Sequence, residues 1–181
     1  LEEWGRPPLA LILPQHLSIS QVIDLPLAPE SEVEKLIEGE TIKLSGVSES
    51  RIVYDFVRTE TAVKNRQQFW VTLSQEGDIR ERIVRLGIEQ EDLCEVTTTA
   101  NALIAAYRAT SPLSSRAILV HLGAQTTVVV VLLAGQGAFA TSFQMGGDFF
   151  TRSLARLRSC SEETAESMKR ANNLLTGPEA C

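Results

Sequence analysis

The sequence predicts an α/β fold, because apolar runs of strand length alternate with segments that have helical periodicity. Residues 9–13 and 128–133 are apolar runs bounded by proline or glycine, whereas Val33, Leu36 and Ile37 recur at the spacing of one helix face. The chain has 181 residues, 44% hydrophobic and 22% charged, which is typical of a soluble globular protein. This length holds one large domain or two small ones.

Charge and cysteine content exclude several classes of protein. The net charge of -6 argues against a nucleic-acid partner, and the arginines at 152, 156 and 158 are interpreted as a solvated helix face. The first residues lack the pattern of a signal peptide, and no stretch reaches the roughly 18 apolar residues of a membrane span. Three cysteines without CxxC spacing or a nearby histidine predict free thiols in a reducing, cytoplasmic compartment.

Each element of the first 110 residues follows from a local pattern. Residues 17–24 alternate apolar and polar side chains and end at a proline, which predicts an edge-type strand. Residues 69–73 are more uniformly apolar, so their strand is expected to be central. Gly87 is expected to end a helix that starts at residue 76. The predicted strands are 9–13, 17–24, 52–58 and 68–74, and the predicted helices are 29–40, 76–86 and 98–109.

The remaining residues predict a three-stranded segment followed by two helices. The strands are 117–122, 128–133 and 138–143, and a hairpin turn at 135–137 joins the last two. Asp148 is expected to cap a helix through about residue 157. Ser161 is expected to open the last helix, through about residue 174.

A candidate phosphate loop lies between the first two of these strands. Gly123 and its small neighbours can expose backbone N–H groups to an anion, and Thr126 and Thr127 add hydroxyl donors. Gly146 and Gly147 precede a helix, where backbone without Cβ atoms can approach a ligand. In isolation the loop is more often an ordinary hairpin turn, and that interpretation stays open.

A second candidate pair is Glu166 and Lys169, which fall on one face of the last helix. A carboxylate can accept hydrogen bonds from ribose hydroxyls, and a lysine stem can cover an adenine ring. The alternative is a solvated ion pair with no ligand.

The order of these motifs resembles a known fold. The segment from Ile118 to Lys169 is similar to the second half of the actin and sugar-kinase nucleotide fold. Over nearly all of its length, the chain resembles the type IV pilus assembly protein PilM family. The residues that carry this resemblance are Leu13-Pro14, Ile23-Asp24-Leu25-Pro26, Tyr54-Asp55-Phe56, Leu86-Gly87 and Thr99-Ala100-Asn101-Ala102.

The resemblance implies an actin-like (ribonuclease H-like) fold fragment with an inserted small α/β subdomain. Residues 1–13 would end the first-lobe sheet, 14–95 would form the inserted subdomain, 96–115 the return helix, and 116–181 the start of the second lobe. By matched position, Gly146 and Gly147 would lie along a nucleotide, and Glu166 and Lys169 would contact its ribose and base. The residues that would face the phosphates are Gly123, Ala124, Gln125, Thr126 and Thr127.

Two departures from the family pattern argue against catalysis. The family's first phosphate turn lies upstream of Leu9, and its last adenosine-binding segment lies beyond the end, so the chain is expected to hold part of a site. His121 stands where the family carries an aspartate that orients magnesium-bound water, and imidazole is a poor magnesium ligand. We assign no catalytic residue and no metal ligand, and we expect weak or no ATP hydrolysis. ATP with magnesium stays open for a full-length parent, and no cofactor is expected here.

The family also implies a role and partners. The expected protein is a cytoplasmic scaffold or adaptor of a type IV pilus, or related type II secretion, assembly platform, peripheral to the inner membrane. It would bind the cytoplasmic tail of a PilN-like inner-membrane protein and other platform proteins. Our own hypothesis for the binding site is a groove between the inserted subdomain and the main lobe, with strand 17–24 as the sheet edge that accepts an extended peptide. Self-association through exposed sheet edges is also expected. The alternatives are an active ATPase, a sugar-kinase relative, or a filament former similar to the division protein FtsA.

Overall fold

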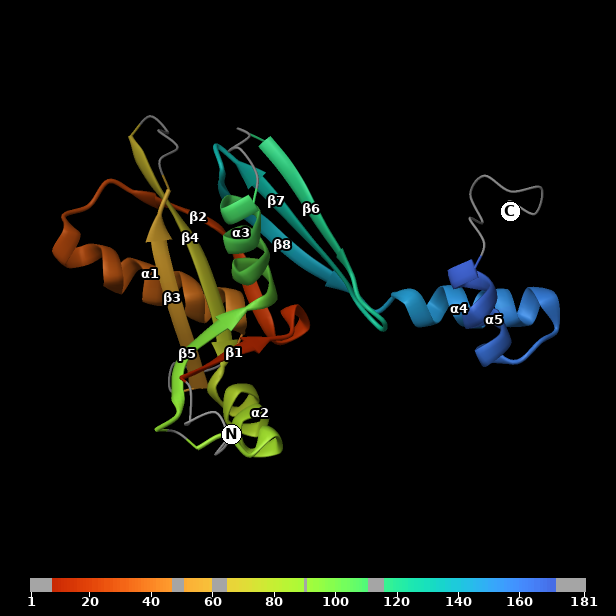
Figure 1. The fold of residues 1–181 in the computed structure, drawn as a ribbon. Coiled ribbons are helices and arrows are strands. Elements are labelled where there is room, and N and C mark those ends of the chain that lie inside the picture. The colour runs from red at the N-terminus through yellow and green to blue at the C-terminus, as the bar shows by residue number, and fades with distance from the viewer. Residues whose placement is uncertain (1–7, 47–50, 60–64, 90, 111–115, 172–181) are drawn as a thin grey trace. The chain divides into compact units, whose positions relative to one another are not determined.

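A computed structural model describes residues 8–46, 51–59, 65–89, 91–110 and 116–171. Contacts divide the chain into two compact units, which are described separately (Figure 1). The larger unit holds residues 1–121 and 128–142, and the smaller unit holds residues 122–127 and 143–181. The four-part division expected from the sequence stays a prediction.

A six-stranded sheet with the strand order β3-β4-β2-β8-β7-β6 dominates the larger unit (Figure 1). Strand β4 pairs antiparallel with β3 on one side and β2 on the other, so the run Phe69–Leu73 is central, as predicted. The strands are β2 (Ser18–Pro26), β3 (Ile52–Arg58), β4 (Arg66–Gln75), β6 (Arg116–Leu122), β7 (Thr127–Leu133) and β8 (Gln136–Phe143).

Strand β2 is not an edge strand, and that prediction is wrong. It pairs with β4 along its whole length, and its other side pairs with β8 at Ser20 and Gln21. Ser20 and Ile23 are buried on opposite faces of the sheet. The alternation that predicted an edge arises because Gln21 and Asp24 remain in contact with solvent within an interior strand.

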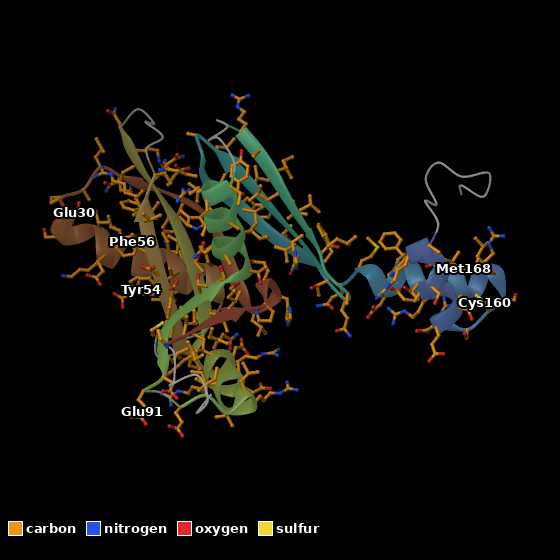
Figure 2. All side chains as sticks on the ribbon, in the orientation of Figure 1. Glu30, Tyr54, Phe56, Glu91, Cys160 and Met168 are labelled. Atoms are coloured by element: carbon orange, nitrogen blue, oxygen red, sulfur yellow. The ribbon has the colours of Figure 1, made fainter. Side chains whose placement is uncertain are left out.

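Two helices cover opposite faces of this sheet because the side chains of β4 alternate. Phe69 and Val71 pack against helix α1 (Glu30–Ser45), with Tyr54 and Phe56 of β3 beside them (Figure 2). Trp70 points the other way, into the cluster that contains Ile104 of helix α3 (Thr99–Thr110). Helix α1 runs past the expected residue 40 and ends at Gly46, whose φ of 65° is left-handed.

A separate parallel pair of strands, β1 (Leu9–Leu13) and β5 (Leu93–Thr98), supports the start of α3. The Thr99 hydroxyl donates to the Leu13 carbonyl at 2.9 Å. Gln15 is buried, and its side-chain oxygen accepts the Ala100 N–H at 3.0 Å. Helix α2 (Glu76–Leu86) follows β4 and ends at Gly87 as predicted, with φ of 63°.

The smaller unit consists of the turn at 122–127 and two packed helices, α4 (Gly147–Arg158) and α5 (Glu162–Ala171). Its core is Leu154, Ala155 and Ala165, with Cys160 and Met168 against them (Figure 2). Ser161 accepts the Thr164 N–H at 3.2 Å, which confirms it as the cap of the last helix. Asp148 is not a cap, because α4 begins one residue earlier with Gly146 in the capping position.

Two further predictions concern thiols and membrane spans. Cys94 and Cys160 are free thiols, and Cys181 lies outside the described residues, as do residues 172–174 of the predicted last helix. Among the helices that the structure describes, none has the length and apolar character needed to cross a membrane.

Candidate functional site

The predicted phosphate loop is docked on the start of α4 through backbone hydrogen bonds. Gly123 closes the turn by donating its N–H to the Thr126 carbonyl at 2.9 Å. The carbonyls of Gly123 and Ala124 accept the N–H groups of Gly147 and Asp148, both at 2.8 Å. Two of the first N–H groups of the helix, which could have bound an anion, therefore bind the turn instead.

Gly146 permits this docking by lacking a side chain. A Cβ atom at this position would lie 2.5 Å from the Gly123 carbonyl oxygen and 2.6 Å from that of Ala124. At Gly147 the nearest atom would be the Lys169 Nζ, 3.6 Å away. The Thr127 hydroxyl also serves the local structure, because it donates to the Met145 carbonyl at 2.6 Å.

Glu166 and Lys169 are brought together, with Thr151 of α4 between the two helices. The Lys169 Nζ lies 2.5 Å from Glu166 Oε2 and donates to the Thr151 hydroxyl at 2.8 Å. Thr151 in turn donates to Glu166 Oε2 at 2.6 Å, and Lys169 also reaches the Gly147 carbonyl at 3.3 Å. Arg170 binds the other carboxylate oxygen of Glu166 at 2.9 Å.

This network holds Glu166 in its charged form. The hydrogen bond from Lys169, followed by those from Thr151 and Arg170, lowers the pKa of Glu166 to about 2. Lys169 and Glu166 are each about two-thirds covered, with exposed side-chain fractions of 27% and 33%. The pair is therefore a partly buried, multiply bonded network rather than a solvated pair, and it links α5 to the start of α4.

An open hollow of about 670 Å³ lies beside this network. It brings together four of the residues predicted from sequence, Ala124, Gly147, Glu166 and Lys169. Gln125, Thr126 and Thr127 do not line it, nor do Gly123 and Gly146. The sequence analysis did not predict Thr151 and Asp148 as site residues. Their positions could have indicated it, because Asp148 follows Gly147 directly and Thr151 lies one helical turn after Gly147 in α4.

His121 lies at the end of β6 and is exposed to solvent. Within the described part of the chain, no group of three or more His, Cys, Asp or Glu side chains is arranged to hold a metal ion. The hollow beside Lys169 is also lined by three further acidic residues, Asp148 on α4 and Glu162 and Glu163 on α5.

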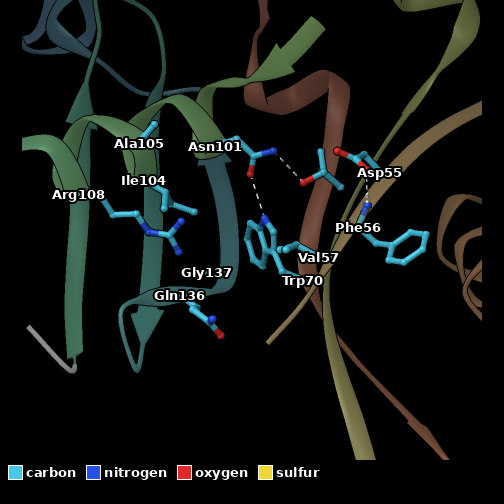
Figure 3. Close-up of a pocket in the computed structure, with 11 residues that line it drawn as sticks. Asp55, Phe56, Val57, Trp70, Asn101, Ile104, Ala105, Arg108, Gln136 and Gly137 are labelled. Atoms are coloured by element: carbon cyan, nitrogen blue, oxygen red, sulfur yellow. Dashed lines mark hydrogen bonds between the residues drawn. The ribbon is translucent and has the colours of Figure 1, made fainter. Parts of the chain in front are cut away.

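A second candidate site is a groove in the larger unit, along α3 (Figure 3). The Asn101 side chain links α3 to β4 in this groove. Its oxygen accepts the Trp70 indole N–H at 2.9 Å, and its amide nitrogen lies 3.5 Å from the Thr72 hydroxyl. Arg108 is held at one end by the Gly135 carbonyl, 3.1 Å from its guanidinium. A Cβ atom at Gly137 would lie 2.8 Å from the Trp70 ring, so only glycine fits under the indole.

The groove consists of two neighbouring hollows, of about 260 and 480 Å³. Both parts are lined by Asp55, Thr72, Asn101 and Ala105. One wall is α3 and another is the pair β3–β4, while β5 borders the larger part. The sequence predicted a peptide groove with residues 17–24 as its edge strand. In the structure, the edge strand that borders this groove is β3.

Comparisons with known proteins concern the fold. No protein-family model matches the sequence, and no curated protein matches it. A solved structure described as a "PilM-PilN type IV pilus biogenesis complex" is similar, with a TM-score of 0.66 and 18% identity over 90% of this chain and 50% of that one. The cytoplasmic domain of EpsL, an inner-membrane component of the type II secretion system of Vibrio cholerae, has a TM-score of 0.51 and 10% identity over 93% and 56%.

The chain spans about half the length of these structures. Their sequence identity is low, so the likeness concerns the arrangement of helices and strands. That arrangement confirms the fold class predicted from the sequence, and this chain has the α/β, actin-like fold.

Proposed function

We propose that this chain belongs to an actin-like adaptor that holds a partner peptide in the groove along α3. The observation that carries the proposal is the groove itself, open along α3 and bordered by the edge strand β3. An edge strand can add an extended peptide through backbone hydrogen bonds, while neighbouring pockets select its side chains. Support for this kind of partner comes from the similar PilM-PilN structure, which is a complex.

The lining residues indicate the chemistry of the peptide. Trp70 and Ile104 supply apolar surface, and Asn101 supplies an amide that is hydrogen-bonded to the Trp70 indole. Asp55 and Glu95 are the acidic groups of the larger part, which has no basic side chain in its lining. An extended segment with apolar side chains and one basic side chain fits this groove, because a cation would meet a carboxylate there.

The partner that we propose is the cytoplasmic tail of a PilN-like inner-membrane protein, within a type IV pilus or related secretion platform. Binding to such a tail would hold the protein at the cytoplasmic face of the membrane. Other platform proteins would contact it there.

The site around Lys169 is, in this proposal, a degenerate nucleotide site rather than a catalytic one. Its two backbone N–H groups bind the turn, and Lys169 already bonds Glu166, Thr151 and Gly147. A phosphate would have to displace these partners. Measured ATP turnover in the full-length protein with magnesium, abolished by His121→Ala, would contradict this part of the proposal.

A substitution that fills the groove tests the adaptor proposal. Ala105 is exposed and lines both parts of the groove, whereas Ala106 is exposed on the same helix and lines neither. We expect A105R to weaken binding of a labelled partner-tail peptide by about tenfold or more, because a long side chain blocks the groove. A106R is the matched control and should bind within about twofold of wild type.

Fluorescence anisotropy with the peptide gives both affinities, and circular dichroism checks that both variants fold. Equal affinity of A105R and wild type would overturn the groove as the binding site. No binding by the wild-type chain would overturn the proposed partner.

A further inference from the structure

The groove along α3 carries opposite charges at its two ends. Arg108 lines the smaller part, and the larger part is lined by Asp55 and Glu95. Figure 3 shows Arg108 and Asp55 on opposite sides of the Trp70 ring. A peptide that fills the groove therefore meets a cation at one end and carboxylates at the other.

Within the described residues, these three charges have no counter-charge. The Arg108 guanidinium donates to the carbonyl of Gly135, which is neutral. The Asp55 carboxylate accepts the N–H of Phe56, the next residue, at 2.8 Å, and Glu95 is in no ion pair with a described residue. The arginines of α2, in contrast, pair with carboxylates of the same helix. Charged groups of a partner could bind in the groove without displacing an ion pair.

Strand β3 and helix α3 run along the groove in the same direction. In β3, Val53 lines the larger part and Val57 the smaller part. In α3, Ala102 lines the larger part and Arg108 the smaller part. A peptide strand that pairs with β3 is more stable antiparallel, which is also how β4 pairs with β3. Such a peptide begins beside Arg108 and ends in the larger part.

The length of the groove sets the spacing of charges in the peptide. Asn101, which lines both parts, lies about 10 Å from Arg108 along the helix axis. An extended chain advances about 3.3 Å per residue, and every second side chain lies on the same face. Two residues span about 7 Å and stop short of Asn101, whereas four span about 13 Å and reach the larger part.

We propose that the groove selects an extended peptide by the order of its charges. An acidic side chain binds at Arg108, and a basic side chain four residues later binds at Asp55 and Glu95. An apolar side chain midway between them packs on Trp70 and Ile104. This inference rests on the proposed function and adds to it a direction and an acidic residue. The reversed order is rejected because it places like charges together at both ends.

Two synthetic peptides of identical composition test the charge order. The first contains Glu-Thr-Leu-Thr-Lys and the second contains Lys-Thr-Leu-Thr-Glu, both with acetyl and amide ends that remove the terminal charges. NMR titration of the isotope-labelled chain at low salt should give about tenfold tighter binding of the first peptide. At about 1 M salt the two affinities should agree within about twofold, because salt screens exposed charges.

A charge reversal in the groove tests the acidic contact. R108E should weaken binding of the first peptide by about fivefold or more. R66E is the matched control, because Arg66 is also exposed and donates to a backbone carbonyl, that of Asp24, but lines neither part of the groove. Its affinity should stay within about twofold of wild type. A spin label at the N-terminal end of the first peptide should broaden the amide signal of Arg108 more than that of Glu95.

Each other result counts against the charge order. Equal affinities for the two peptides at low salt, tighter binding of the second, or no binding of either would overturn it. Equal losses in R108E and R66E, or stronger broadening at Glu95, would do the same. Binding of the partner tail that A105R weakens would still support the groove as the peptide site, so failure of the charge order is distinguishable from failure of the proposed function.

Discussion

At the scale of single residues, Gly146 and Gly147 are neighbours in sequence with different constraints. A Cβ at Gly146 would collide with two backbone carbonyl oxygens that bind the start of α4, whereas Gly147 has room for one. We expect G146A to destabilise the docked turn by about 1–3 kcal/mol, as other overpacked sites do. Amide hydrogen exchange at residues 147 and 148 measures the loss. G147A is the control, and equal losses in both variants would contradict the steric explanation.

A second residue-scale prediction concerns Glu166. Its pKa is lowered from 4.5 to about 2, so ionisation of Glu166 favours the folded state above about pH 4.5. This contribution is lost as the pH falls from 4.5 towards 2, when the carboxylate takes up a proton and its bond with Lys169 weakens. An NMR titration of the Glu166 carboxyl carbon reads the pKa directly.

The Thr151→Val variant separates the parts of this network. Removing the hydroxyl deletes one hydrogen bond to Glu166, so the pKa should rise towards its ordinary value. Ser167→Ala on the same helix is the control, because the Ser167 hydroxyl bonds the Glu163 carbonyl instead. A pKa near 4.5 in the wild-type chain would show that the network does not form in solution.

At this scale the sequence predicted that certain residues lie close together, but not all of the groups that they contact. Glycines at 146 and 147 predicted a close backbone approach, and the approach exists, although its partner is the turn rather than a ligand. The i, i+3 spacing of Glu166 and Lys169 predicted their shared face. The bond to Thr151 depends on how α4 packs against α5, which helical spacing within α5 does not specify.

At the scale of elements, local patterns predicted each strand that carries an uninterrupted apolar or alternating run. They missed β5, because Cys94 and Glu95 interrupt its pattern and its pairing with β1 joins residues more than 80 positions apart. They also misplaced β2 at an edge. Strand β2 pairs with β8 at two residues only, and β8 lies more than 100 positions later in the chain. The local pattern of neither strand therefore predicts this pairing.

Two glycines give opposite predictions at this scale. Gly137 lies near the start of β8, and a Cβ atom at this position would collide with the Trp70 ring. G137A should therefore destabilise the larger unit by about 1–3 kcal/mol. Gly39 is inside α1 and meets no atom where a Cβ would stand, so G39A should stabilise the chain by about 0.5–1 kcal/mol. Urea unfolding followed by tryptophan fluorescence measures both. A stabilising G137A would refute the packing of the indole against this glycine.

At the scale of the whole molecule, separate apolar clusters predict separate unfolding. The cores on the two faces of the large sheet both include residues of β4, so they are linked through one strand. The α4–α5 core of Leu154, Ala155 and Ala165 shares no residue with them. Elements with their own small core open locally at lower free energy than the rest of a protein.

The variant L154A tests this separation. Leu154 is buried between the helices, so its truncation should cost about 2–4 kcal/mol and raise hydrogen exchange throughout α4 and α5. Exchange in β2 and β4 should stay unchanged, because their cores are intact. Leu157 is 64% exposed on the same helix, and L157A should change exchange little, within about 0.5 kcal/mol. If L154A instead loosens β2 and β4 as much as α4, the two units unfold as one, and their cores are coupled.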